Sequence, residues 1–264
     1  MPNTQKLSKD EIEANKIKII ELFNSKVKGR TSNVAKSNLR HDGKHGHWLE
    51  HEMGVAFNSS NSPDILGFEM KNATTGKTTF GDWSGDYRIY SIKEGGSLTR
   101  DEFLSIFGHP NPAKNGRFSW SGRVCPNKPG PYNKFGQRMI IGEESNISII
   151  YEFNEDKRPD KYSIVPEKFR NGIIVLERWS AAILKQRVES KFNQNGWFKC
   201  EKDNRTGLYD SIVFGEPITF ETWISFVKNG DVIFDCGMYQ GNVRPYHNWR
   251  ASNNFWVSLI TSRY

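Results

Sequence analysis

Helical and strand patterns alternate along the whole chain, and this alternation limits the possible folds more than any other feature. Capping-box pairs and apolar residues at helical spacing predict helices over about 9–26, 44–55, 99–107, 180–194 and 219–230. Runs rich in β-branched and aromatic residues predict strands over about 63–73, 137–142, 146–153, 172–179, 211–214, 231–241 and 254–260. Interleaved helices and strands are typical of an α/β protein, here with helices flanking a mixed central sheet.

One large domain accounts for the length of the chain. Its 264 residues contain no internal repeat, low-complexity linker or clear domain boundary. Hydrophobic residues make up 36% of the chain and aromatic residues 13%, which is enough to fill a globular core. We therefore expect a single domain over residues 1–264.

The chain lacks the apolar segments that membrane and secreted proteins carry. No run reaches the roughly 18 apolar residues that a membrane span needs, and residues 1–16 have no apolar signal-peptide core. The three cysteines, Cys125, Cys200 and Cys236, are odd in number and have no CxxC spacing. This pattern argues against a disulfide framework and against a cysteine-based zinc site, so we expect a reduced, cytoplasmic protein.

Positive charge is concentrated in two segments that contain no Asp or Glu, in a chain whose net charge is +7. The segments are 103–142 and 236–264, and both are rich in Asn, Gly and aromatic residues. Such segments are suited to bind a polyanion such as DNA, although solvated loops that happen to lack acids would give the same pattern. Five prolines between 110 and 131 predict that much of the first segment is irregular. Its candidate DNA contacts are Arg117, Arg123, Lys128 and Arg138.

The second basic segment contains a predicted loop over 239–254, between two predicted strands. Arg pairs with guanine and Asn with adenine through two hydrogen bonds each, so such a loop can read base edges. A long hairpin, with Trp249 packed on the protein and the Arg side chains solvated, is the alternative. The candidate base-reading residues are Arg244, His247, Asn248 and Arg250.

The stretch "NSPDILGFEMKN", residues 61–72, places three charges in an apolar run. Because side chains alternate along a strand, Glu69 and Lys71 project from one face while Phe68 and Met70 anchor the other face in the core. A turn before the strand can bring Asp64 alongside Glu69. Two carboxylates at a sheet edge form a hard-oxygen site suited to Mg²⁺, and a neighbouring lysine can orient or deprotonate a water. The arrangement suits metal-assisted hydrolysis of a phosphodiester, with an ordinary surface charge pair as the alternative.

Two other Glu-x-Lys pairs lack the features of Glu69 and Lys71. Glu155 and Lys157 stand in a charged turn, and Glu189 and Lys191 stand in a predicted helix. Neither pair has an Asp five residues earlier or an apolar residue in the middle. We therefore expect the chemistry at 64–71.

The segment "PDILGFEMK" resembles the active-site segment of the PD-(D/E)xK nucleases. The preceding "DGKHGHWLEHEMGV", residues 42–55, resembles the Gly-x-x-Gly-x-x-Leu-Glu helix of their MutH-like branch, and within it the chain is most similar to the MvaI/BcnI restriction endonucleases. Weaker similarity continues through "SIFGHPNP", "SWSGR" and "MYQGNVRPYHNWRASNNFWVSL".

This resemblance implies a restriction-endonuclease-like fold with a catalytic core over about 40–160 and DNA-recognition elements over about 107–138 and 237–256. It also implies that Asp64 and Glu69 bind Mg²⁺, that Lys71 assists the water, and that Glu50 supports the site. Members of the family read short G·C-rich sites, so we expect double-stranded DNA as the partner and a monomer that nicks one strand and then the other.

The helix over 44–55 also contains "HWLEH", the H-x-x-E-H pattern of some zinc proteases. His47 and His51 would share a zinc ion on one helix face, with His45 nearby and Glu50 as the general base. The helix is short, however, and a protease gives the basic segments no role, so exposed histidines on a DNA-facing helix are the preferred interpretation.

A type II restriction endonuclease is the function that these features predict. A MutH-like enzyme that nicks DNA for repair is the closest alternative, but it would require protein partners for which the chain shows no clear docking element. A DNA-binding protein without catalytic activity would leave Asp64, Glu69 and Lys71 without a purpose.

Overall fold

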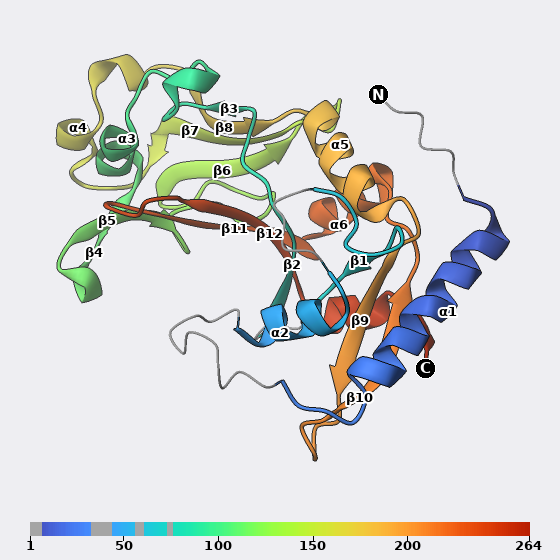
Figure 1. Cartoon of the computed structure of the whole chain (residues 1–264). Helices are drawn as coiled ribbons and strands as arrows, with labels where there is room; N and C mark the ends of the chain where they lie inside the picture. Colours follow the sequence, from blue (N-terminus) through green and yellow to red (C-terminus); the bar gives the residue numbers. More distant parts are fainter. Residues whose placement is uncertain (1–6, 33–43, 56–60, 73–75) are drawn as a thin grey trace. The chain divides into compact units, whose positions relative to one another are not determined.

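A computed structural model describes residues 7–32, 44–55, 61–72 and 76–264, and the chain forms two compact units (Figure 1). The first unit comprises Met1–Thr78, Arg187–Thr219 and Asn253–Tyr264, and the second comprises Thr79–Gln186 and Phe220–Ser252. Each unit is thus assembled from segments that lie far apart in the sequence. The single nuclease domain over 1–264 and its core over about 40–160 stay predictions.

The first unit contains a four-stranded mixed sheet in the order β1-β9-β10-β13. Its strands are β1 (Glu69–Met70), β9 (Trp197–Lys202), β10 (Tyr209–Gly215) and β13 (Ile260–Arg263). β1 pairs in parallel with β9, whereas β10 pairs antiparallel with both β9 and β13. β1, which carries Glu69, is therefore an edge strand, and the sequence analysis expected the two carboxylates at such a sheet edge.

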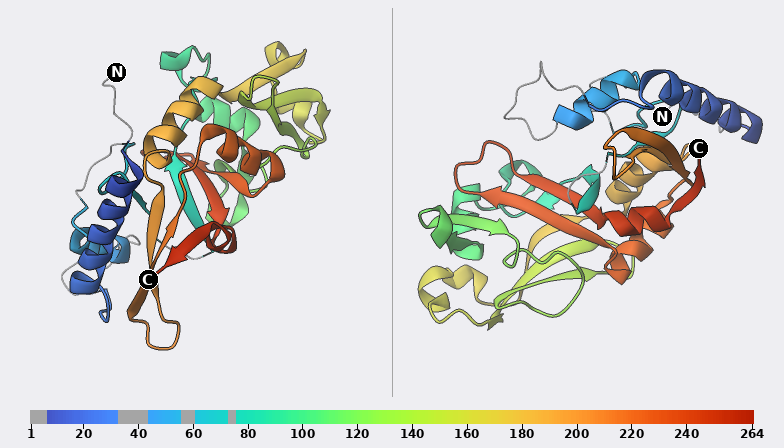
Figure 2. Two further views of the ribbon diagram at one scale, coloured as in Figure 1. Left: turned by 90° about the vertical axis from the view of Figure 1, so that its right-hand side faces the viewer. Right: turned by 90° about the horizontal axis from the view of Figure 1, so that it is seen from below.

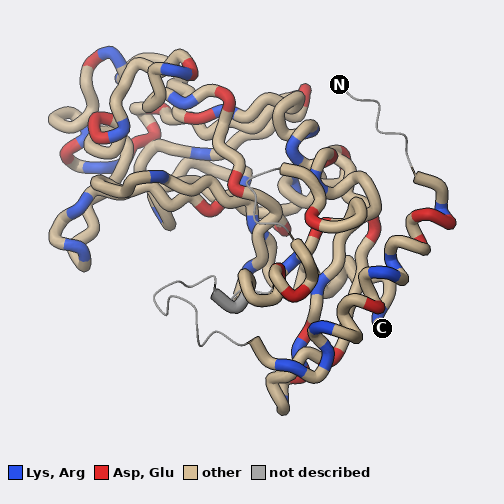
Figure 3. The backbone as a smooth tube through the Cα atoms, viewed as in Figure 1, with Lys and Arg blue, Asp and Glu red and all other residues tan. Residues whose placement is uncertain are grey.

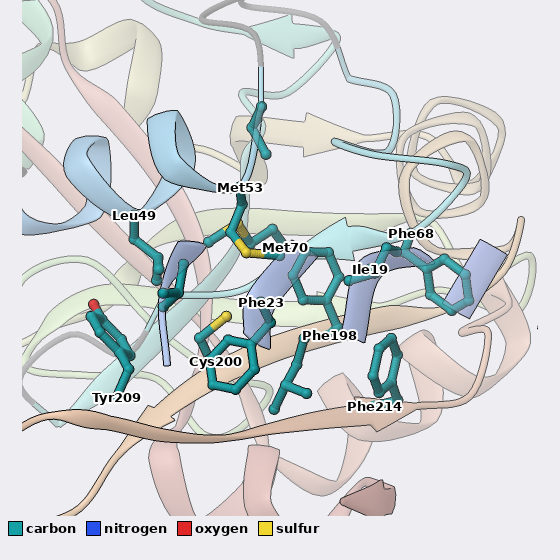
Figure 4. Close-up of a cluster of buried hydrophobic side chains, with 13 residues drawn as sticks. Ile19, Phe23, Leu49, Met53, Phe68, Met70, Phe198, Cys200, Tyr209 and Phe214 are labelled. Carbon is teal, nitrogen blue, oxygen red and sulfur yellow. The ribbon is translucent and has the colours of Figure 1, made fainter. Parts of the chain in front are cut away.

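Two helices, α1 (Lys9–Lys26) and α2 (Lys44–Glu52), cover one face of this sheet (Figure 2, right). The predicted capping box starts α1, because the Ser8 side chain accepts a hydrogen bond from the Glu11 backbone N–H and the Glu11 carboxylate accepts one from Ser8. The core cluster in Figure 4 joins the two helices to Phe68 and to the strand residues Met70, Phe198, Cys200, Tyr209, Ile212 and Phe214. Burial of each large side chain stabilises the fold by about 1.5–3 kcal/mol.

The opposite face of the sheet packs on the C-terminal half of α5 (Ala181–Phe192) and on α7 (Asn253–Ser258). The ring of Trp256 lies 5.0 Å from that of Trp197 and 6.3 Å from that of Phe192. The predicted strand over 254–260 is therefore wrong, because its first part is helical and only Ile260 enters β13. A short apolar run does not distinguish a buried strand from a buried helix, and here packing of Trp256 selects the helix.

The second unit contains two sheets. One has the order β2-β12-β11-β5-β4, with β2 beginning at the end of the first unit, and the other has the order β3-β8-β7-β6. Their strands are β2 (Lys77–Asp82), β3 (Tyr87–Arg88), β4 (His109–Asn111), β5 (Arg117–Ser121), β6 (Phe135–Ile141), β7 (Ile147–Asp156), β8 (Ile173–Trp179), β11 (Val232–Tyr239) and β12 (Tyr246–Ser252). The helical elements of this unit are η1 (Ile92–Glu94), α3 (Arg100–Phe107), η2 (Pro112–Lys114), α4 (Lys161–Ile164), η3 (Glu167–Phe169), α6 (Phe220–Asn229) and the first half of α5.

The predicted α/β class with helices flanking a mixed sheet is confirmed, although the strands are distributed over three sheets. Two local predictions need correction. The proline-rich segment contains β4 and β5, and the predicted loop over 239–254 is short, because β12 occupies Tyr246–Ser252. β2 and β9 were not predicted. Within the described part of the chain, no helix is long and apolar enough to cross a membrane.

Candidate active site

A tight turn brings Asp64 back to the edge strand. Ile65 and Phe68 form an isolated antiparallel bridge, and the two residues between them have left-handed backbones, with φ of 49° at Leu66 and 81° at Gly67. The turn allows Asp64 Oδ2 to accept a 2.8 Å hydrogen bond from the Met70 backbone N–H. The predicted position of Asp64 beside the strand is thus what the structure shows.

Backbone pairing with β9 fixes the strand that carries Glu69 and Lys71. Glu69 N–H donates to the Gly196 carbonyl at 3.0 Å, and Lys71 N–H donates to the Phe198 carbonyl at 2.8 Å. Because Met70 points into the core cluster, the Glu69 and Lys71 side chains project to the opposite face, toward α5 and α7. Both are nevertheless buried, at 2% and 6% exposure.

Two lysines share one oxygen of Glu69. Lys71 Nζ lies 2.7 Å from Glu69 Oε1, and Lys191 Nζ lies 3.1 Å from the same atom. The other oxygen, Glu69 Oε2, is buried and has no hydrogen-bond partner among the described residues. Lys191, on α5, is a residue of this site that the sequence analysis missed.

Aromatic rings hold the Lys71 ammonium in place. Its Nζ lies 5.0 Å from the centre of the Phe192 ring and 6.0 Å from that of Trp256. A cation near an aromatic face is attracted by the ring, and the attraction grows when the cation is removed from water. These rings therefore compensate part of the cost of burying a charge beside Glu69.

Burial shifts the ionisation of two of these groups. Burial and the negative charge of Glu69 together raise the pKa of Asp64 to about 6, so the two carboxylates are close enough to repel each other. Burial also lowers the pKa of Lys71, and the positive charge of Lys191 adds to this effect while Glu69 opposes it. A lower pKa leaves more of the amine neutral near neutral pH, and only the neutral amine can accept a proton from a water.

Glu50 is connected to the site through Asn72. Asn72 Nδ2 donates a 3.1 Å hydrogen bond to Glu50 Oε1, and Asn72 directly follows Lys71. Asn72 Oδ1 is buried without a partner among the described residues. This contact fits a supporting position for Glu50, whose role stays a prediction. Residues 42 and 43 of the helix motif lie outside the described residues.

The H-x-x-E-H histidines do not converge on a site. His47 is exposed, and the His51 side chain is 76% exposed with Nδ1 3.5 Å from Glu52 Oε1. The side chain of His45 lies outside the described residues. In the described part of the chain, no group of three or more His, Cys, Asp or Glu side chains could hold a metal ion.

The donor set at Asp64 and Glu69 nevertheless fits Mg²⁺. This ion is usually held by one or two carboxylates together with waters and phosphate oxygens of the substrate, so a third acid is not required. Glu69 Oε2, which has no hydrogen-bond partner among the described residues, is an oxygen of the kind that such an ion binds, and the Asp64 carboxylate is close enough to interact electrostatically with Glu69.

The candidate DNA contacts of the first basic segment all lie in the second unit, where the β4–β5 hairpin carries Lys and Arg but no acid (Figure 3). Arg123 and Lys128 are exposed. The guanidinium of Arg117 stacks 3.7 Å from the Tyr239 ring centre, and that of Arg138 lies 4.5 Å from the Tyr132 ring centre. Stacking fixes the direction of an Arg side chain and leaves its N–H groups able to donate.

Two Arg residues of the second basic segment are paired with acids on neighbouring strands. Arg244 Nη2 lies 2.7 Å from Asp82 Oδ2, and Arg250 Nη1 lies 2.8 Å from Asp235 Oδ2. The side chain of Arg244 is 78% exposed, whereas that of Arg250 is 24% exposed. Asn248, on the same strand as Arg250, is half-buried.

The structure contradicts a base-reading position for the His247 side chain, which is only 2% exposed. Its Nε2 lies 3.0 Å from the Tyr90 hydroxyl, which donates a 2.6 Å hydrogen bond to Glu177 Oε2, and its ring stacks on Phe234. Burial lowers the pKa of His247 to about 4 and raises that of Glu177 to about 7. His247 is therefore a buried core residue of the second unit, because β12 alternates and points it inward.

Comparison with known proteins identifies the class and the family. A family model for restriction endonucleases matches residues 26–264, which makes the chain a site-specific deoxyribonuclease of the restriction class. The family is that of the LlaMI restriction endonuclease, and the chain belongs to it. The chain is 48% identical to the type II restriction enzyme ScrFI of Lactococcus lactis subsp. cremoris over 266 residues, with 94% of this chain and 97% of the relative covered.

The fold agrees with this assignment. The structure resembles that of the restriction endonuclease MvaI in complex with its cognate DNA substrate, with a TM-score of 0.57, 12% sequence identity, and 98% of this chain and 99% of that chain covered. The predicted resemblance to MvaI-type restriction endonucleases and the predicted enzyme class are confirmed. The family also decides against the zinc protease and against the non-catalytic DNA-binding protein. Type II restriction enzymes generally use a divalent metal ion.

Proposed function

We propose that this chain cleaves double-stranded DNA at a short G·C-rich site, with Mg²⁺ held by Asp64 and Glu69. The observation that carries the proposal is the buried Glu69 Oε2, which lacks a partner among the described residues, on a carboxylate whose other oxygen faces two ammonium groups and which interacts electrostatically with Asp64. The DNA complex of the structurally similar MvaI supports DNA as the substrate.

The residues of the site divide the chemistry between them. Mg²⁺, when bound, supplies positive charge to the phosphate and lowers the pKa of a water. Asp64 and Glu69 provide the oxygens that hold it, and the turn and the β1–β9 pairing keep those oxygens in place. The water oxygen bonds to phosphorus as the bond to the 3′ oxygen breaks, and the 3′ oxygen takes up a proton from solvent, which leaves a 5′-phosphate and a 3′-hydroxyl.

Lys71 orients or deprotonates the attacking water. Its Nζ is fixed by Glu69 Oε1 on one side and by aromatic rings on the other, so little conformational freedom is lost during the reaction. Its lowered pKa increases the fraction of neutral amine, which is the form that can accept a proton from the water. Glu50 supports the strand through Asn72.

DNA is held by the second unit in this proposal. Arg117, Arg123, Lys128 and Arg138 contact phosphates, and Arg244, Asn248 and Arg250 contact base edges. The enzyme acts in the cytoplasm as a monomer that nicks one strand and then the other. The buried free thiols Cys125, Cys200 and Cys236 suit a reducing compartment.

Cleavage of a plasmid of known sequence tests the proposal. The protein is incubated with the plasmid in Mg²⁺ and, in parallel, in EDTA, and the fragment ends are sequenced. We expect discrete fragments with a common short sequence at their ends and a 5′-phosphate, in Mg²⁺ only. Glu69→Gln, purified in the same way, should leave the plasmid intact. Discrete cleavage in EDTA, or by Glu69→Gln, would exclude this metal site.

A further inference from the structure

Lys191 and Lys71 both pair with Glu69, but the two side chains are held differently. Both ammonium groups face Glu69 Oε1, but Lys191 is farther away, at 3.1 Å against 2.7 Å. The Lys191 side chain is also more exposed, at 19% against 8% for Lys71. Lys71 additionally faces the rings of Phe192 and Trp256. Of the two lysines, Lys191 is the one that can leave Glu69 at lower cost.

The position of Lys191 on α5 determines the direction of its side chain. Leu184, Val188 and Phe192 are fully buried on α5, and Lys191 is spaced from them so that it shares their face. A charge on the apolar face of a helix needs a partner, and Glu69 provides one. The lysine stem is thus packed toward the sheet while its ammonium reaches the acids at the edge strand.

The same negative charge would attract both Lys191 and a divalent cation. Two carboxylates that repel each other in a buried site require positive charge nearby, and Lys191 supplies part of it when no cation is bound. A cation at these carboxylates therefore competes with Lys191, since like charges a few ångströms apart repel strongly at low dielectric. A phosphate that enters the site offers the displaced ammonium a new partner.

We propose that Lys191 is the counter-ion of Glu69 in the free enzyme and that it moves from Glu69 to the scissile phosphate when DNA binds, which leaves Glu69 free to bind Mg²⁺. This inference rests on the proposed function of Asp64 and Glu69. This exchange makes DNA and the cation bind cooperatively, because DNA draws Lys191 away from Glu69 and the cation repels Lys191 from it. An enzyme of this kind holds Mg²⁺ weakly until DNA is present.

Removal of the Lys191 charge should raise the affinity of the protein for a divalent cation and lower its affinity for DNA. In DNA-free protein, Lys191→Met should bind Mn²⁺ about tenfold more tightly than the wild type, measured by the electron paramagnetic resonance signal of unbound Mn²⁺. In EDTA, the same variant should bind a short duplex containing the mapped cleavage site severalfold more weakly, measured by fluorescence anisotropy. The slope of log affinity against log salt should also be smaller by about one for this variant, because one phosphate contact is lost.

Three controls make the result decisive. Lys191→Arg keeps the charge and should resemble the wild type in Mn²⁺ binding. Lys185→Met removes a 54% exposed lysine from the same helix and should change Mn²⁺ binding little. Glu69→Gln should abolish the Mn²⁺ binding that Lys191→Met enhances.

Weaker Mn²⁺ binding by Lys191→Met would overturn the inference, because it would mean that Lys191 only orients Glu69. Unchanged duplex binding would overturn the exchange onto phosphate. Neither result would affect the proposed metal site. Undiminished Mn²⁺ binding by Glu69→Gln would instead remove the metal site itself, and the inference with it.

Discussion

The Asp64 carboxylate accepts a 2.8 Å hydrogen bond from the backbone N–H of Met70, so the turn between them is closed by the same side chain that it delivers to the site. The bond places Asp64 next to Met70 in β1, the two-residue strand at the edge of its sheet. The turn and the position of a candidate metal ligand thus depend on the same hydrogen bond, so a change in the turn should lower the cleavage rate.

Removal of any of the three central side chains should stop cleavage. Asp64→Asn and Glu69→Gln each remove a carboxylate, and Lys71→Ala removes the group that assists the water, at a cost of about 10²- to 10⁴-fold in rate. Lys71→Arg should not restore activity, because its guanidinium does not deprotonate and its planar fork does not replace a compact ammonium. Plasmid cleavage and duplex binding are measured side by side, and binding should be largely retained. Near-normal cleavage by a variant would remove that residue from the site.

Asp64→Asn should also stabilise the metal-free enzyme at neutral pH. The pKa of Asp64 is raised from 3.8 to about 6, so the folded state holds its proton more tightly than the unfolded state does. Stability is therefore lost as pH rises through this window, by about 3 kcal/mol once the pH is above both values. Asn does not ionise and avoids this loss. Thermal unfolding in EDTA should show a gain for the variant at pH 8 that shrinks toward pH 4, and an equal gain at both pH values would contradict this origin.

Gly67→Ala should damage both the fold and the site. Gly67 has a φ of 81°, and a Cβ there would lie 2.5 Å from Asn195 Nδ2, which itself donates to the Leu66 carbonyl at 2.8 Å. The left-handed backbone alone costs about 1–2 kcal/mol for a residue with a Cβ, and the clash adds to it.

Gly207→Ala is the matched control for this change. Gly207 has a φ of 70° in the turn between β9 and β10, with nothing within 4 Å of the added Cβ. Its loss of stability should be smaller, and its cleavage rate should be near that of the wild type. Equal effects on unfolding and on cleavage in the two variants would mean that Asn195 does not hold the Asp64 turn.

The central part of the site could be predicted because it is local. Asp64, Glu69 and Lys71 lie within one turn and one strand, so the strand period and a short motif were sufficient to place them. Lys191 also belongs to a Glu-x-Lys pair, but a pair that stands in a helix does not indicate a position beside Glu69. The signal that could have found it was different, namely a charge at the spacing of the buried residues Leu184 and Val188.

The same contrast between local and non-local features applies to the helices and strands. The α1 and α3 helices have capping boxes and were placed almost to the residue. β12 was missed because polar residues hide its alternation, in which His247, Trp249 and Ala251 are buried and the residues between them are not. Its pairing with β11 makes the segment a strand. That pairing depends on residues outside the segment, which a local sequence pattern does not include.

The first basic segment should contribute phosphate contacts. Each phosphate neutralised by a side chain releases counter-ions, so Arg117→Gln, Arg123→Gln and Lys128→Gln should each reduce the slope of log affinity against log salt by about one. Anisotropy titrations over a range of salt concentrations measure this slope. Lys18→Gln, an exposed change on α1 outside the residues that the family model matches, is the control for net charge. Unchanged slopes in all three variants would mean that the segment does not contact DNA.

Arg244 and Arg250 should determine sequence preference rather than general affinity. Asp82 and Asp235 hold their guanidinium groups, and an Arg held in this way has fewer orientations to lose when it pairs with guanine. Arg244→Ala or Arg250→Ala should cost about 1–3 kcal/mol at one base pair and little on random DNA. Competition binding between the cleaved sequence and its single-base variants measures this loss. Arg205→Ala, which removes a 92% exposed Arg from the β9–β10 turn, is the control.

Asp82→Asn tests, in the same competition experiment, whether Asp82 orients the Arg244 side chain. The Asp82 carboxylate also accepts the His247 backbone N–H at 2.7 Å, so it ties Arg244 to the start of β12. If Asp82 orients Arg244, its loss should weaken discrimination at the base pair that Arg244→Ala identifies, and at no other. If both Arg variants instead weaken binding equally on cleaved and random duplexes, these residues grip phosphates, and the specificity determinants should be sought between Arg117 and Arg138.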